Sequence, residues 1–210
     1  MKVITTVTAA MLAGCPGVYS DPPTSLPDAA PDTPPDMLVV QGKRVFVTST
    51  PYQGGLLGGL AGADAKCGEA ATAGGLTGTY SAWLSTSAMP ARDRLAHAME
   101  PYVLVDGSAQ VAAGWDALVS GTLEHAIDRD EHGNAVSSPI KCTVVGGLVA
   151  VWTGTEYDGT YSTVVNNCDG WASTTGNATI GNVVAKTSKW TSNSCVLACT
   201  DTAPLYCIEQ

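Results

Sequence analysis

Seven cysteines constrain the fold of this 210-residue chain more than any other feature. Cys15 stands apart from the rest, and the other six are Cys67, Cys142, Cys168, Cys195, Cys199 and Cys207. An even set in an exported chain is expected to form disulfides, but six cysteines allow 15 pairings and their positions select none of them. A metal site has less support, because no Cys-x-x-Cys pair occurs and Cys195-x-x-x-Cys199 lacks a second pair or a nearby histidine.

The residues before Cys15 are typical of an export signal. Lys2 precedes an uncharged run that is too short to cross a bilayer, which needs about 20 apolar residues. Leu12-Ala13-Gly14-Cys15 resembles the bacterial lipobox, in which the chain is cut before the cysteine and the cysteine is acylated. The resemblance implies a signal peptide over 1–14, lipid attachment at Cys15, and anchoring in the bacterial cell envelope, at the outer membrane or cell surface. The alternative is a secreted protein with an incidental cysteine.

Composition separates a tether from a domain. Proline and aspartate recur over 16–36 without an apolar period, so this segment cannot bury enough surface to fold. We therefore expect a tether over 15–37 and one domain over 38–210. The domain has nine Lys and Arg against fifteen Asp and Glu, a net charge of −6, and no basic cluster. Nucleic acid and heparin-like polyanions are therefore poor candidates as partners.

Local patterns predict a mixed domain with more strand than helix. Alternating or apolar runs predict strands at 43–48, 80–84, 102–105, 148–153 and 204–208. A run of small residues that ends at a glycine pair predicts a helix over 62–75, and a second helix is predicted over 90–99. The Gly-, Thr-, Ser- and Asn-rich region between Trp152 and Cys199 is expected to form long ordered loops with few regular elements.

Several segments together resemble a known family. In order, they are GGLLGGLAGADAKCGEAATAGGLTGTYSAWLSTS, PYVLVDGSAQVAAGWDALVSG, VWTGT, NNCDGW and PLYCIEQ. They are similar to the endostatin domain and to a related bacterial lipoprotein family, both of the C-type-lectin-like fold. The resemblance implies an α+β domain with two helices, a mainly antiparallel sheet whose first and last strands lie together, and long loops stapled by disulfides. It also implies the pairs Cys67–Cys207 and Cys168–Cys199, which leaves Cys142 with Cys195.

The sequence departs from these relatives where they bind ligands. It has neither the arginine cluster with which endostatin binds heparin nor the N-terminal histidines that hold zinc there. The Glu-Pro-Asn, Gln-Pro-Asp and Trp-Asn-Asp motifs of calcium-dependent lectins are also absent. We therefore do not expect the common sugar-binding mechanism of this fold.

A charged stretch, LEHAIDRDEHGN, is the best candidate for metal chemistry. It contains Glu124, His125, Asp128, Asp130, Glu131 and His132. Part of it resembles a calcium loop, but Pro139 stands where that loop needs a bidentate glutamate. A solvated hairpin at the Gly-Asn turn explains the charges more simply than a transition-metal site does. His97, which lies between two alanines, is expected to be structural.

Nothing in the sequence supports catalysis. No serine has the Gly-x-Ser-x-Gly context, and the cysteines are accounted for by disulfides and lipid. We therefore predict a non-catalytic protein that needs no cofactor.

The five tryptophans are the best candidates for binding. Three lie in apolar patterns and are expected in the core: Trp83, Trp115 and Trp152. The polar loops supply the predicted ligand contacts, which are Asn166, Asn167, Asp169, Trp171 and Trp190. Alternatively, Trp171 only packs over the disulfide of Cys168.

Three functions are therefore open. The first is a membrane-anchored, non-catalytic domain that binds an extracellular glycan, matrix polymer or protein through the loops of 166–194. The second is a structural envelope protein. The third is a metal-dependent protein or enzyme that uses the cluster at 124–132.

Overall fold

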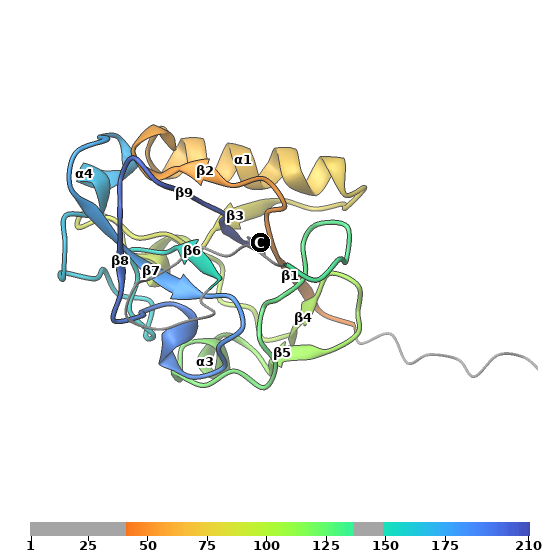
Figure 1. The fold of residues 1–210 in the computed structure, drawn as a ribbon. Coiled ribbons are helices and arrows are strands. Elements are labelled where there is room, and N and C mark those ends of the chain that lie inside the picture. Colours follow the sequence, from red (N-terminus) through yellow and green to blue (C-terminus); the bar gives the residue numbers. More distant parts are fainter. Residues whose placement is uncertain (1–40, 137–148) are drawn as a thin grey trace, which may run out of the picture. The chain divides into compact units, whose positions relative to one another are not determined.

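The computed structural model describes residues 41–136 and 149–210, and these form a mixed α+β fold (Figure 1). Its largest sheet contains β1 (Lys43–Val47), β3 (Tyr80–Ala82), β4 (Tyr102–Leu104), β5 (Gln110–Ala112) and β10 (Tyr206–Glu209). The strand order is β3-β10-β1-β4-β5. Only the β1–β4 pair is parallel, so the prediction of a mainly antiparallel sheet is confirmed.

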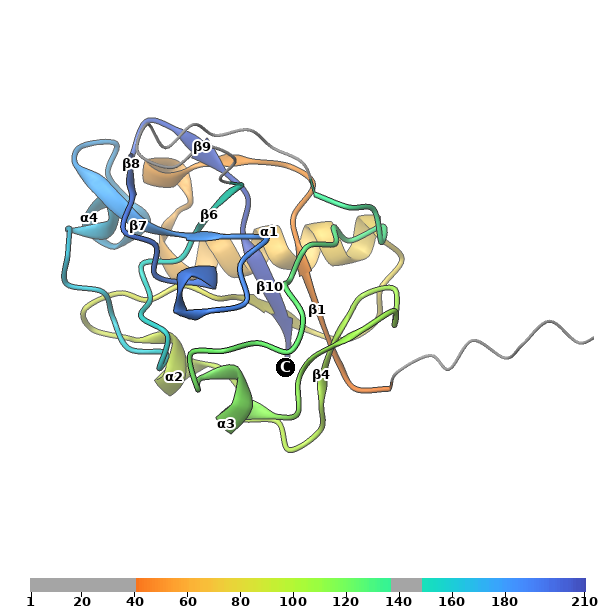
Figure 2. The same cartoon turned by 60° about the horizontal axis from the view of Figure 1, so that its bottom comes forward.

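The first and last strands of this sheet lie side by side, as predicted. In the β1–β10 pair, Phe46 is opposite Cys207 and Val47 is opposite Tyr206. The strand β10 lies beside β1 (Figure 2). Its other neighbour is β3, so it is an interior strand of the sheet. The register directs Phe46 and Cys207 to one face of the sheet, and Val45 and Tyr206 to the other, and all four side chains are buried.

The helix α1 (Gly59–Ala73) covers one face of the sheet (Figure 1). It begins three residues before the predicted start and is followed by Gly74-Gly75, of which Gly75 has a φ of 69°. Its buried face consists of small side chains, Ala63, Cys67, Ala70 and Ala71. Small residues allow the helix backbone to lie close to the sheet, and the predicted helix is confirmed.

A second core fills the opposite face of the sheet. It contains Trp83, Trp115 and Trp190 together with Tyr206. The ring of Trp83 lies 5.0 Å from that of Trp190 and 5.9 Å from that of Trp115, between centroids. These aromatic contacts join three segments that are far apart in the chain.

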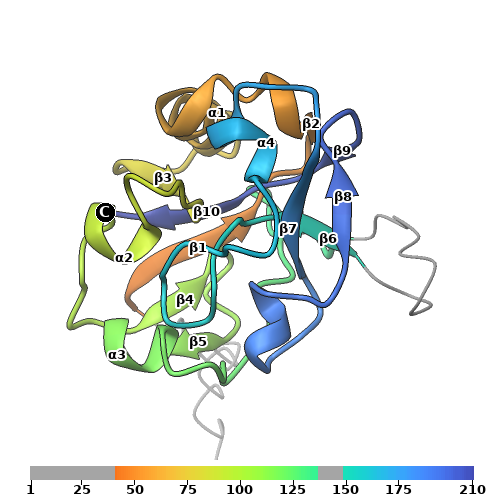
Figure 3. The ribbon, with the colours of Figure 1, turned by 90° about the vertical axis from the view of Figure 1, so that its left-hand side faces the viewer.

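A second sheet combines the predicted strand at 148–153 with two strands from the region predicted to be mostly loop. Its strands are β6 (Ala150–Trp152), β7 (Asn177–Asn182) and β8 (Val196–Ala198), in the order β6-β7-β8 (Figure 3). Four of the six residues of β7 are buried, including the polar Thr179 and the glycine Gly181. A Cβ atom at Gly181 would lie 1.9 Å from the carbonyl oxygen of Trp190, so only glycine fits at this buried position. A search for buried strands by their large apolar residues therefore does not detect it. The short strands β2 (Tyr52–Gln53) and β9 (Thr202–Ala203) form a separate pair.

The second predicted helix, over 90–99, is wrong in length. The helix α2 covers only Ala91–Arg94, and Leu95 is extended, with φ −92° and ψ 149°. Side chains from elsewhere satisfy the next backbone groups: Ala96 N–H donates to Oε1 of Gln210 at 2.9 Å, and the Tyr102 hydroxyl donates to the Ala96 carbonyl at 3.2 Å. These long-range hydrogen bonds replace those that a longer helix would make. Two further single turns are α3 (Trp115–Leu118) and α4 (Asn167–Trp171).

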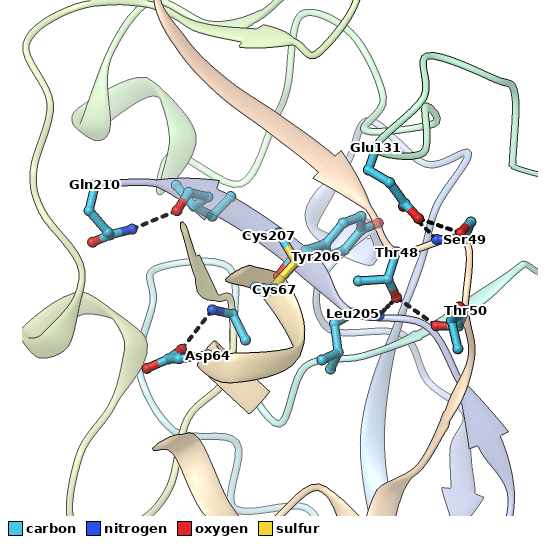
Figure 4. The surroundings of a disulfide bond; sticks show 12 residues. Thr48, Ser49, Thr50, Asp64, Cys67, Glu131, Leu205, Tyr206, Cys207 and Gln210 are labelled. Atoms are coloured by element: carbon cyan, nitrogen blue, oxygen red, sulfur yellow. Dashed lines mark hydrogen bonds between the residues drawn. A yellow bond between two sulfur atoms is a disulfide. The ribbon is translucent and has the colours of Figure 1, made fainter. Parts of the chain in front are cut away.

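Two predicted disulfides are confirmed. Cys67 of α1 is bonded to Cys207 of β10 (Figure 4), and Cys168 is bonded to Cys199. Cys195 is also disulfide-bonded, whereas its predicted partner Cys142 lies outside the described residues. The predicted signal peptide, Cys15 and the tether lie outside them as well.

Candidate functional site

The predicted ligand-binding tryptophans lie in the core. Trp171 and Trp190 are both 0% exposed, as are Trp83 and Trp152, while Trp115 is 8% exposed. Trp171 packs edge-on against Trp152, with centroids 6.0 Å apart, and its indole N–H donates to the Ser85 carbonyl at 2.9 Å. The prediction of core positions for Trp83, Trp115 and Trp152 is confirmed. The prediction that Trp171 and Trp190 present aromatic faces to a ligand is corrected, because both rings are enclosed by the fold.

The segment that carries Trp171 has an unusual backbone. All five residues of α4, Asn167 to Trp171, have positive φ angles, from 46° at Asn167 to 70° at Trp171. This is a turn of left-handed helix, and only one of its residues is glycine. The left-handed conformation costs roughly 1–2 kcal/mol for each residue that has a Cβ atom, so surrounding contacts must hold the turn in place.

Three side chains of the turn supply those contacts. The side-chain amide of Asn167, which is 0% exposed, donates from Nδ2 to the Ser162 carbonyl at 2.9 Å and accepts at Oδ1 from Thr179 N–H at 2.8 Å. Cys168 is bonded to Cys199, and Trp171 makes the core contacts described above. The turn is therefore tied to five separate places in the chain, at Ser85, Trp152, Ser162, Thr179 and Cys199.

Two of the five predicted ligand contacts remain on the surface. Asn166 and Asp169 are exposed, and neither side chain makes a hydrogen bond or an ion pair with another described residue. Asn167 is buried and has a structural role. A ligand at this loop would therefore meet one amide and one carboxylate, without an aromatic face.

The charged stretch at 124–132 is organised by its own hydrogen bonds. Oδ1 of Asp130 accepts from the backbone N–H groups of His132 at 2.9 Å and Asn134 at 2.8 Å. Glu131 is 4% exposed and accepts from both the backbone N–H and the hydroxyl of Ser49 (Figure 4). The prediction of a solvated hairpin is therefore corrected for Asp130 and Glu131, which are buried and close the turn against the end of β1.

The two histidines of this stretch contact different groups. Nδ1 of His125 lies 2.8 Å from the Ala126 carbonyl oxygen, and Nε2 of His132 lies 3.7 Å from Oε1 of Glu131. Within 41–136 and 149–210, no three His, Cys, Asp or Glu side chains are placed to hold one metal ion. In the same part of the chain, no helix has both the length and the apolar character needed to cross a membrane.

Comparisons with known proteins add no assignment. No protein-family model matches the chain, and no curated protein matches it.

The structure also places a cavity where the sequence indicated none. It has a volume of about 430 Å³ and lies between the segment after α2 and the start of α3. His97, Met99, Gly114, Trp115 and Asp116 are among its lining residues. His97 and Trp115 are 18 residues apart in the sequence, so their contact could not be inferred from a local pattern.

Proposed function

We propose that this chain is an exported bacterial lipoprotein that displays a non-catalytic binding domain. Acylated Cys15 anchors it in the cell envelope, at the outer membrane or cell surface, and residues 15–37 form the tether. The domain binds an extracellular glycan, matrix polymer or protein.

The use of the cysteines carries this proposal. Every cysteine among the described residues is disulfide-bonded: Cys67, Cys168, Cys195, Cys199 and Cys207. Disulfides form and persist in oxidising compartments outside the cytoplasm, which suits a chain that begins with an export signal. Cys15 then has a separate use, and the lipobox resemblance supplies it.

We also propose the C-type-lectin-like fold for this domain. Two observations support it. The disulfides Cys67–Cys207 and Cys168–Cys199 are those that the endostatin resemblance implies, and the first and last strands are paired as in that fold. Folds of this kind host many functions, so the fold supports a display scaffold and does not choose a ligand.

Anchoring is tested by labelling. Expressed in a bacterial host, the full chain should incorporate radioactive palmitate and enter the detergent phase of Triton X-114. A Cys15→Ala variant should do neither, because its sulfur is lost. A Cys15→Ala variant that is still labelled, or a wild-type chain that is not, would disprove acylation at this residue.

Ligand binding is tested separately. The chain from Pro16 to Gln210, oxidised and shown to be folded by its circular dichroism, is applied to immobilised glycans, matrix polymers and extracellular proteins. Saturable binding supports a recognition domain. An Asn166→Ala, Asp169→Ala variant tests whether the surface of the left-handed turn takes part, since both side chains are exposed and their loss leaves the core intact. No binding on any surface would favour the structural envelope protein instead.

A further inference from the structure

The cavity between α2 and α3 contains a rigid aromatic platform. The imidazole of His97 lies flat on the indole of Trp115, with centroids 4.0 Å apart and an angle of 11° between the planes. Nε2 of His97 lies 2.7 Å from the carbonyl oxygen of Arg92, which can only accept a hydrogen bond. Nε2 must therefore carry the hydrogen, and its bond holds the ring in this orientation. Nδ1 makes no hydrogen bond with another described residue, so an exposed ring is fixed in place with one nitrogen unused.

Trp115, which lines the same cavity, has an indole N–H without a hydrogen-bond partner among the described residues. The residue is 8% exposed, and the indole N–H groups of Trp83, Trp152 and Trp171 all have acceptors within the fold. The N–H of Trp115 has no acceptor among the described residues. It is nevertheless not fully buried, unlike the Tyr80 hydroxyl and the Trp190 N–H, which are buried without a partner. The side chain of Trp115 is thus more than nine-tenths buried, while its N–H is not sealed from solvent.

The charge around the cavity is negative. Asp116 lines it, Glu100 follows the lining residue Met99, and both carboxylates are exposed without a hydrogen bond or ion pair to another described residue. Among the residues that the structure describes, the lining of this cavity includes no Lys or Arg. Because residues 38–210 carry a net charge of −6, the field of the domain also attracts cations.

We propose that this cavity binds a lysine or arginine side chain of an extracellular protein, together with the backbone next to it. The cation would lie near Asp116, beside the stacked rings of His97 and Trp115, with its methylene stem on the apolar lining that includes Met99. A neighbouring peptide carbonyl would accept from the Trp115 indole N–H. The donor favours a peptide over a simple polyamine, which has no carbonyl to offer. This inference rests on the proposed binding function and narrows its ligand to a basic protein segment.

The test uses the oxidised chain from Pro16 to Gln210 and defined peptides. The probes are acetyl-Gly-Gly-Arg-Gly-Gly-amide, its lysine counterpart, and a norleucine peptide of the same length without the charge. Binding is followed by NMR at the Trp115 indole N–H and the His97 ring. We expect saturable shifts at both groups with the Arg and Lys peptides and none with the norleucine peptide.

Matched variants separate a site from general charge attraction. Asp116→Asn should weaken peptide binding by up to about fivefold, as expected for an exposed ion pair. Asp201→Asn, an equal change of charge at another exposed carboxylate, should leave it within about twofold. Equal weakening by the two variants, or no shift at Trp115, would overturn the proposal.

Two further probes identify a different occupant. Spermidine that binds as well as the peptides would show that the carbonyl contact is not used. Neutral oligosaccharides that shift the same two groups, with no effect of the peptides, would make this a glycan site. Such glycan binding would overturn the peptide proposal but leave the proposed recognition function in place. If none of these probes bound, while the immobilised panel gave a positive result, the peptide proposal would be overturned and the ligand site would lie elsewhere on the domain.

Discussion

Replacement of Asn167 tests the left-handed turn directly. Asn167→Ala removes the hydrogen bonds to the Ser162 carbonyl and from Thr179 N–H, and leaves both backbone groups buried without a partner. Each such loss costs about 1–3 kcal/mol, and alanine tolerates a φ of 46° less well than asparagine does. We expect the free energy of unfolding to fall by about 3–5 kcal/mol.

A glycine at the same position separates the backbone from the side chain. Asn167→Gly loses the same hydrogen bonds but has no Cβ atom to strain the left-handed conformation. Strain costs alanine about 1–2 kcal/mol, whereas glycine loses about 0.4–1 kcal/mol through the entropy of the unfolded chain. The glycine variant should therefore be the more stable of the two by roughly 0.5–1 kcal/mol.

Gly68 provides the matched control. It lies within α1, and a Cβ atom there would have no neighbour within 4 Å. Gly68→Ala should raise stability by about 0.5–1 kcal/mol, because alanine is more stable than glycine within a right-handed helix. All variants are compared by urea unfolding of the oxidised chain, followed by tryptophan fluorescence. If alanine were more stable than glycine at both positions, the left-handed geometry at Asn167 would be refuted.

The remaining predictions concern buried tyrosines and the longest disulfide loop. Tyr80→Phe should leave stability unchanged or raise it by up to about 1 kcal/mol, because the buried Tyr80 hydroxyl has no hydrogen-bond partner. Tyr206→Phe should lower stability by about 1–3 kcal/mol, because the Tyr206 hydroxyl donates to the Trp190 carbonyl at 3.1 Å. The same urea assay compares the two variants, and equal effects would contradict the structure. Burial, together with Glu209, raises the pKa of Tyr80 to about 12 against an ordinary 10.0. The neutral form of Tyr80 is thus favoured in the fold, so the stability that this effect contributes is complete below pH 10 and is lost between pH 10 and 12. In a titration followed by absorbance at 295 nm, Tyr80 of the folded chain should therefore ionise at higher pH than it does in the unfolded chain. Replacing both Cys67 and Cys207 by Ser should cost about 5 kcal/mol on the chain-entropy estimate for 140 residues, and a change in the urea midpoint too small to detect would show that this bridge does not restrict the unfolded chain.

Much of the fold could be predicted because its signals are local. The run of small residues over 62–75 predicts a helix, and alternating or apolar runs predict β1 and β10. The end of α2 had no such signal, because the hydrogen bonds that replace a longer helix come from Tyr102 and Gln210. The strand β7 was missed because its buried residues include Thr179 and Gly181, which apolar patterns do not reveal.

The candidate sites were harder to predict than the fold. Trp171 and Trp190 have polar neighbours in the sequence, yet the left-handed turn and the second sheet direct both rings inward. A signal for the turn was present: Asn167, Asp169 and Gly170 are of the three residue types that tolerate positive φ best. The His97–Trp115 contact has no counterpart in local sequence, because it depends on two segments meeting in space.

The position of β10 has a consequence for how this protein is made. The last strand in chain order occupies the interior of the largest sheet, and its neighbour β1 lies about 160 residues earlier in the chain, from Phe46 to Cys207. A ribosome synthesises the chain from its first residue onward and so delivers β1 long before β10. Until β10 is available, the edge of β1 that pairs with it has no partner strand. Pairings across such a separation form slowly. The complete sheet can therefore form only after the final strand has been synthesised, so assembly of this sheet is a late step in the folding of the chain.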